Sequence, residues 1–145
     1  MLKFNVKISG LEEGQKITKE KAEKILMLCM MKMEELAIKN APVDQGFLRL
    51  NISLFPQLLS NKYVLTSNAD YSAAMEYGTR PFWAPIEPLK AWAARKIGDE
   101  GLGYAIQANI AKYGIKAHPY MRPALNEVLN FWYDFYSKQV FSSSI

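Results

Sequence analysis

Cysteine and histidine are almost absent from this chain of 145 residues, which contains one of each, Cys29 and His118. A single cysteine cannot form an internal disulfide and is typical of a reducing compartment. One cysteine and one histidine also exclude a cysteine-rich zinc site or a multi-histidine metal centre within one chain. We therefore expect neither a metal nor a cofactor.

Long apolar runs are also missing, since the longest covers seven residues, from Ile25 to Met31. A membrane-spanning helix needs ~20. The first residues do not combine a basic segment, an apolar stretch and a small-residue cleavage site, so we expect no membrane span and no secretion signal. Half of the residues are apolar and 22% are charged, which is typical of a globular domain. The length fits one domain over residues 1–145.

Arginine is scarce, because fourteen of the 18 basic residues are lysines and four are arginines. The 14 acidic residues leave a net charge of +4, and residues 80–122, with seven basic and three acidic side chains, contain that whole surplus. Bidentate recognition of bases or phosphates favours arginine. The surplus is thus interpreted first as solvated surface, with a phosphate-binding role for residues 80–122 as the alternative.

Catalytic motifs are absent as well. There is no Walker-type loop, and the segment Gly101–Gly103 lacks the third glycine of a dinucleotide loop, because Ile106 stands in its place. A serine or cysteine nucleophile would need a base, whereas His118 is typical of a loop residue. The spacing of Asp44 and Glu76 does not indicate an acid–base pair, and a helix cap and a helix end explain them better. The sequence therefore favours a protein that is not an enzyme.

Periodicity predicts a mixture of strands and helices. Strict alternation from Met1 to Ser9 indicates a half-buried strand. Apolar residues at intervals of three and four predict a helix that starts after a Thr18 cap and ends near Asn40. The next expected elements are strands over 51–55 and 62–67 in a hairpin, a helical segment over 71–77 and an irregular proline-rich segment over 80–88. Helices are expected over 89–97 and 103–113, and Pro123 opens a last helix. The apolar face of this last helix comprises Leu125, Val128, Leu129, Trp132, Phe135 and Tyr136.

Two segments are candidate subunit interfaces. The proline-rich segment is irregular, yet it is too aromatic for an ordinary solvated loop. The long first helix has a methionine-rich stripe that could touch a second surface, although adaptable core packing explains it better. The candidate interface residues are Phe82, Trp83, Arg80, Met27, Met30 and Met31.

Three segments carry a family resemblance: APVDQGFLR at 41–49, YSAAMEYGT at 71–79 and HPYMRPAL at 118–125. In this order they resemble the neck and tail-component proteins of long-tailed bacteriophages and prophages, which act as head–tail connectors or tail-completion proteins. The resemblance covers nearly the whole chain. It implies that Pro42, Asp44, Gly46 and Leu48 shape the turn after the first helix, that Tyr71, Glu76, Gly78 and Thr79 fix the corner before the proline-rich segment, and that Pro119, Arg122 and Pro123 start the last helix.

The resemblance implies an α+β fold, in which a small, mostly antiparallel sheet is packed by a long N-terminal helix and a C-terminal helix. The implied function is structural: copies assemble as a ring at the capsid–tail joint, around the DNA channel of the virion. The implied partners are further copies, adjacent head-completion or connector proteins, tail-terminator or tail-tube proteins, and at most non-specific contact with channel DNA. Glu76 is expected to pair with Arg80 or Arg122, within or between subunits.

Two other classes stay open at this point. A nucleic-acid-binding protein that uses residues 80–122 would bind free duplex with a steep salt dependence. A small enzyme, such as a nuclease or hydrolase, would need metal ligands or a nucleophile–base pair, neither of which the sequence offers.

Overall fold

The computed structural model describes residues 1–6, 19–57 and 62–142, in which three strands form one antiparallel sheet of order β1-β3-β2. Strands β1 (Leu2–Val6) and β2 (Ile52–Gln57) flank the central strand β3 (Lys62–Ser67). The helices are α1 (Lys19–Asn40), α2 (Phe47–Leu50), α3 (Ser72–Tyr77), α4 (Ile86–Lys96), α5 (Leu102–Tyr113), α6 (Met121–Glu127), the π-helical turn η1 (Val128–Trp132) and α7 (Tyr133–Ser142). The α+β class and the hairpin are confirmed, whereas the proposed Thr18 cap lies outside the described residues.

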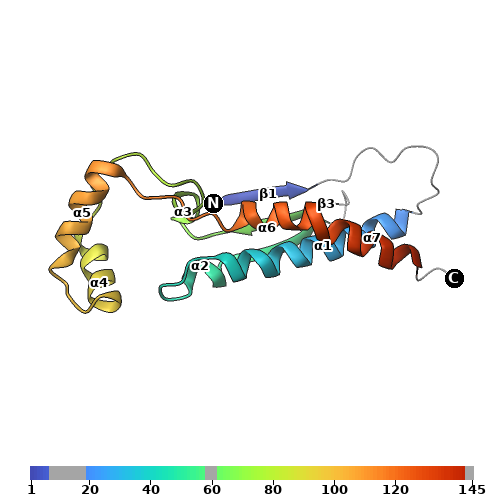
Figure 1. The fold of residues 1–145 in the computed structure, drawn as a ribbon, viewed down its shortest axis with the longest axis horizontal. Helices are drawn as coiled ribbons and strands as arrows, with labels where there is room; N and C mark the ends of the chain where they lie inside the picture. The colour runs from blue at the N-terminus through green and yellow to red at the C-terminus, as the bar shows by residue number, and fades with distance from the viewer. Residues whose placement is uncertain (7–18, 58–61, 143–145) are drawn as a thin grey trace.

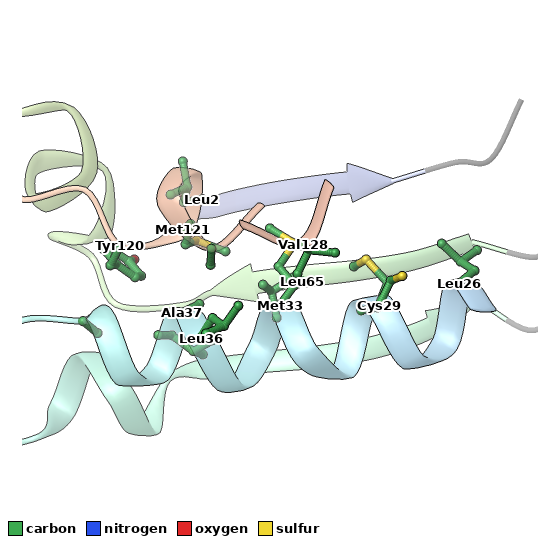
Figure 2. Packing of buried hydrophobic residues seen from close by; sticks show 14 of the residues in the cluster. Leu2, Leu26, Cys29, Met33, Leu36, Ala37, Leu65, Tyr120, Met121 and Val128 are labelled. Atoms are coloured by element: carbon green, nitrogen blue, oxygen red, sulfur yellow. The ribbon is translucent and has the colours of Figure 1, made fainter. Parts of the chain in front are cut away.

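Helix α1 covers one face of the sheet, and α6, η1 and α7 run beside it in the opposite direction (Figure 1). Cys29 and Met33 of α1 lie with Leu65 of β3 and Val128 of η1 in the core (Figure 2). Burial raises the pKa of the Cys29 thiol to about 11, so this thiol stays protonated near neutral pH. The buried cluster consists of Leu2, Ile25, Leu26, Cys29, Met30, Met33, Leu36, Ala37, Ala41, Leu48, Ile52, Leu65, Ala69, Tyr120, Met121, Ala124, Val128 and Val140.

The methionines of α1 divide between core and surface. Met30 is 1% exposed, so its assignment to a subunit interface is wrong. It lies four residues after Leu26, and helical spacing therefore places both side chains on the core face. Met27 and Met31 are 46% and 49% exposed and remain candidates for contact with another molecule.

The outer edge of β2 is covered by a side chain of α1. The carboxylate Oε1 of Glu34 accepts a hydrogen bond of 2.9 Å from the backbone N–H of Leu54. Alternate N–H groups of an edge strand point away from the sheet, so the next outward position is Pro56, which has no N–H to offer. This edge therefore presents few free donors to another strand, which limits strand-to-strand aggregation.

Two helices begin earlier than their prolines predict. Helix α4 starts at Ile86 and α6 starts at Met121, so Pro88 and Pro123 are each the third helical residue. The N–H groups of a first helical turn have no acceptor within the helix. A proline anywhere in that turn therefore removes no helical hydrogen bond, and it does not mark the first residue.

The apolar face predicted for the last helix is wrong at two positions. Val128 is buried, and Trp132 and Tyr136 pack against the core, but Leu129 and Phe135 are 55% and 48% exposed. For Phe135 the reason is η1, whose hydrogen bonds join residues five apart instead of four. A wider turn shifts every later residue around the helix axis, so a pattern based on 3.6 residues per turn fails beyond it.

Candidate assembly surfaces

The carboxylate of Glu76, near the end of α3, joins two distant parts of the chain. Glu76 is 3% exposed, and its Oε2 accepts hydrogen bonds from the backbone N–H groups of Tyr120 (2.8 Å) and Met121 (2.9 Å). Its Oε1 accepts a third, of 2.8 Å, from the N–H of Arg122. These donors open α6, where no helical acceptor is available. Glu76 therefore caps α6, with its charge at the positive end of the helix dipole.

The expected ion pair of Glu76 is not formed within the chain. In the part of the chain that the structure describes, Glu76 has no salt bridge with Arg80 or Arg122. The guanidinium of Arg122 lies 5.2 Å from the ring centroid of Tyr77 instead. Because the carboxylate oxygens are occupied by backbone donors, the arginine is left at the surface.

Two chain segments run side by side next to this cap. The N–H of Thr79 donates to the carbonyl oxygen of Ile115 (2.9 Å), and the N–H of Ile115 donates to Oγ1 of Thr79 (2.9 Å). Gly78 and Gly114 have φ angles of 73° and 77°, in the left-handed region that favours glycine. A Cβ on Gly78 would lie 2.7 Å from the carbonyl oxygen of Ile115, and one on Gly114 would meet the carbonyl of Thr79. This crossing, called the junction below, needs both glycines.

Asp44 links the turn after α1 to helix α4. Its carboxylate accepts a hydrogen bond of 2.6 Å from the Arg95 guanidinium and lies 3.8 Å from the Lys96 ammonium. The hydrogen bond from Arg95 and the two positive charges lower the pKa of Asp44. The expected role of Asp44 as a helix cap is wrong, because Gly46 occupies the N-cap of α2 and no side chain caps it. The carboxylate binds α4 instead.

The second of the three segments that carry the family resemblance thus contacts both of the others, although 30 residues or more separate the first residues of successive segments. Arg49 of the first segment donates to the carbonyls of Lys39 and Ala41 and so closes the end of α1. The ring of Phe47 lies 6.2 Å from that of Tyr71 in the second segment. The remaining motif residues divide by burial: Leu48 belongs to the core, Pro42, Gly46, Gly78 and Thr79 are half-buried, and Tyr71, Pro119, Arg122 and Pro123 are exposed.

Residues 80–116, called the arm below, project from one end of the molecule (Figure 1). Helices α4 and α5 pack so closely that a Cβ on Gly103 would lie 2.9 Å from the Cα of Lys90. The amide of Gln107 donates a hydrogen bond of 2.7 Å to the carbonyl of Ala84, which ties the proline-rich segment to α5. Ala93 and Ile110 are buried, but they lie outside the core cluster of the body. The arm therefore buries a small apolar surface of its own.

The arm exposes large aromatic side chains. Trp83 is 73% exposed and Phe82 is 40% exposed, and Arg80 beside them is exposed as well. A side chain of this size at the surface leaves a large apolar area in water unless another molecule covers it. The other large apolar residues that the arm exposes are Trp92, Ile97, Leu102, Tyr104 and Tyr113.

A second aromatic surface lies at the opposite end of the molecule, on η1 and α7 (Figure 1). Phe131 and Phe135 are 58% and 48% exposed, and their rings stack with centroids 6.4 Å apart. Behind them, the ring of Trp132 meets Phe131 edge-on at 5.1 Å and the Lys32 ammonium at 4.2 Å. With Tyr136, these rings form the terminal aromatic cluster, namely Phe131, Trp132, Phe135 and Tyr136.

Sequence reasoning did not identify this cluster as a surface, although a signal was present. Five of the six residues from Phe131 to Tyr136 are aromatic. One helical turn points its side chains in all directions, so a helix on the surface of a body cannot bury five consecutive or nearly consecutive rings. Some of them must face outward, whatever the exact period of the helix.

The basic residues of 80–122 divide between ion pairs and free surface. Lys90 pairs with Glu100 at 3.0 Å, and Arg95 and Lys96 approach Asp44. Among the described residues, no ion pair is formed by the other four basic side chains. These are Arg80, Lys112, Lys116 and Arg122, all of which are exposed in or next to the junction.

Three further findings concern membrane-spanning helices, metal sites and similarity to known proteins. In residues 1–6, 19–57 and 62–142, no helix has the length and apolarity that crossing a membrane requires. In the same residues, no three His, Cys, Asp or Glu side chains are grouped so that they could hold a metal ion. Comparison with protein-family models, with curated proteins and with solved structures finds no match to this chain.

We predict that Glu76→Ala lowers the free energy of unfolding by about 3 kcal/mol, because three N–H donors at the start of α6 lose a charged acceptor. Urea unfolding measures this loss. Glu87→Ala is the matched control, since Glu87 is an exposed glutamate, and it should change stability by no more than about 0.5 kcal/mol. Equal stability of the two variants would contradict the cap.

We predict that Asp44→Asn destabilises the protein at pH 7 by about 0.5 kcal/mol, through loss of the link to Arg95. The pKa of Asp44 is lowered in the folded state, so this stabilisation is present above the ordinary value of 3.8 and is lost as pH falls through the lowered value. The difference between Asp44→Asn and the wild type should therefore begin to shrink as pH falls toward 3.8 and should vanish only below the lowered folded-state pKa. Urea unfolding over pH tests this, with exposed Asp70→Asn as a control that shows no such pH dependence.

Proposed function

We propose that this chain is a structural virion protein of the phage head–tail connection, and not an enzyme. It assembles as a ring at the capsid–tail joint, around the DNA channel, as a neck or tail-completion protein. It is made in the cytoplasm of the host bacterium and then resides in the neck or tail region of the virion. The proposal draws on the family resemblance of the three segments, the second of which contacts the first through Tyr71 and Phe47 and the third through Glu76 and the start of α6.

The observation that supports assembly most directly is the arm. It stands away from the body and exposes Trp83 and Tyr113, which are 73% and 64% exposed. Aromatic residues are enriched in protein interfaces because they bury large areas while losing little conformational entropy. A projecting arm that carries such side chains suits contact with a neighbouring subunit better than it suits a free monomer.

The proposed partners follow from a position between capsid and tail. Copies of the chain contact one another in the ring, while a head-completion or connector protein lies on one side and a tail-terminator or tail-tube protein on the other. Contact with channel DNA is at most non-specific. Met27 and Met31, exposed on α1, are further candidates for these contacts.

We predict that Trp83→Ala weakens self-association and leaves the fold intact, because the side chain is mostly exposed in one copy. Sedimentation velocity measures assembly, and circular dichroism and urea unfolding measure the fold. Phe55→Ala is the control, because Phe55 is an aromatic residue that β2 exposes to 51%. Loss of the fold in Trp83→Ala would show instead that the side chain belongs to the core.

A second candidate function is binding of duplex nucleic acid at the junction. It is favoured by the four exposed basic side chains without ion pairs in the described part of the chain, two of which lie over exposed tyrosine rings. Arg122 lies over Tyr77, and the Lys112 ammonium lies 4.9 Å from the ring centroid of Tyr113. Cationic side chains without ion pairs can bind the phosphates of a duplex.

This candidate predicts that duplex DNA binds with a slope of log K against log salt of about −3, from three to four phosphate contacts. The double variant Lys112→Ala/Lys116→Ala should make the slope shallower by about 2. Fluorescence anisotropy over a salt series measures both slopes. Lys24→Ala/Lys62→Ala removes two exposed lysines of the body as a control. If both double variants change the salt slope equally, the loss of net charge explains the change, and a binding site at the junction is contradicted.

A further inference from the structure

The molecule has two exposed aromatic surfaces, and they lie at opposite ends (Figure 1). The arm carries Phe82 and Trp83 at one end, and the terminal aromatic cluster lies on η1 and α7 at the other. A chain of this shape cannot bring its own two ends together. Two different exposed surfaces, one in the arm and one on η1 and α7, suit a heterologous, head-to-tail contact between copies, which forms a ring when the rotation closes.

The charges of the two ends differ in sign. The arm, residues 80–116, contains six basic and three acidic residues, an excess of three positive charges. Residues 127–142, which contain η1 and α7, have Glu127 and Asp134 against Lys138, an excess of one negative charge. Lys32 of α1, which lies over the Trp132 ring, is paired with Glu35 and does not change this balance. Arm-to-arm contact in a symmetric dimer would bring like charges together, whereas arm-to-cluster contact brings opposite charges together.

The side chains of the terminal aromatic cluster are held in place before any partner side chain binds. Trp132 and Tyr136 pack against the core, and the indole N–H of Trp132 donates a hydrogen bond of 3.1 Å to Glu127. The stacked rings of Phe131 and Phe135, with planes 11° apart, rest on this base. Side chains that are already held in place lose little entropy on binding, and such aromatic groups dominate interface energetics.

We propose that Trp83 of one copy packs on the terminal aromatic cluster of the next copy, so that the contact runs head to tail around the ring. Phe82 borders this contact, and the basic arm faces Glu127 and Asp134 of the neighbour. The inference rests on the proposed self-assembly and identifies its two surfaces.

The test uses two variants, each with one intact surface. The arm variant is Trp83→Ala, and the cluster variant is Phe131→Ala/Phe135→Ala. Each variant alone should associate at least about tenfold more weakly than the wild type. A mixture of equal amounts should form a complex of two copies, one of each variant, because the intact arm of the cluster variant binds the intact cluster of the arm variant. Light scattering after size exclusion measures these masses, and Phe55→Ala should assemble like the wild type.

Other outcomes overturn the inference and separate it from the proposed function. If the cluster variant assembles like the wild type, the arm docks elsewhere and ring assembly itself still stands. The same conclusion holds if both variants are impaired and their mixture forms no complex. A wild-type chain that stays monomeric contradicts self-assembly and the inference together. If circular dichroism shows that the double variant is unfolded, Phe131→Ala, at the more exposed ring, replaces it.

Discussion

The hydrogen bonds from Tyr120, Met121 and Arg122 to the Glu76 carboxylate are the interaction on which the arrangement of the molecule depends. They fasten the end of α3 to the start of α6, so the chain must leave the body after α3 and return to it before α6. Everything between these two points becomes the arm. A charged acceptor at three otherwise unpaired donors is a strong and geometrically specific link, because the N–H groups of Tyr120 and Met121 would otherwise be buried without a partner.

The other contacts of the junction fix where the arm points. Gly78 and Gly114 allow the two connecting segments to run against each other, and the Asp44–Arg95 pair ties α4 to the turn after α1. The arm has little apolar surface buried against the body, so these polar contacts set its position. The result is an elongated molecule with aromatic side chains exposed at both ends, as expected of a subunit that assembles end to end.

Local patterns in the sequence predict the elements well and their partners poorly. The short strand expected over 62–67 and the helical spacing before Asn40 depend on neighbouring residues, and both predicted elements are confirmed. Glu76 and Tyr120 are 44 residues apart, so no local pattern could show that one caps the helix after the other. The π-helical turn changes the period within the last helix, so Phe135 is exposed where the sequence pattern predicts that it is buried. Met27 is exposed and Met30 is buried because only one side of α1 packs against the rest of the protein, and composition does not reveal which side that is.

The central claim is that this chain assembles with itself into a ring of fixed size. The most direct test is the mass of the native particle, measured by light scattering after size exclusion across a wide range of protein concentration, with and without added duplex DNA. The account predicts one discrete multimer whose mass is a whole multiple of 16.5 kDa and does not depend on DNA. A monomer at every concentration that nevertheless binds free duplex tightly at moderate salt would contradict it and favour a nucleic-acid-binding protein.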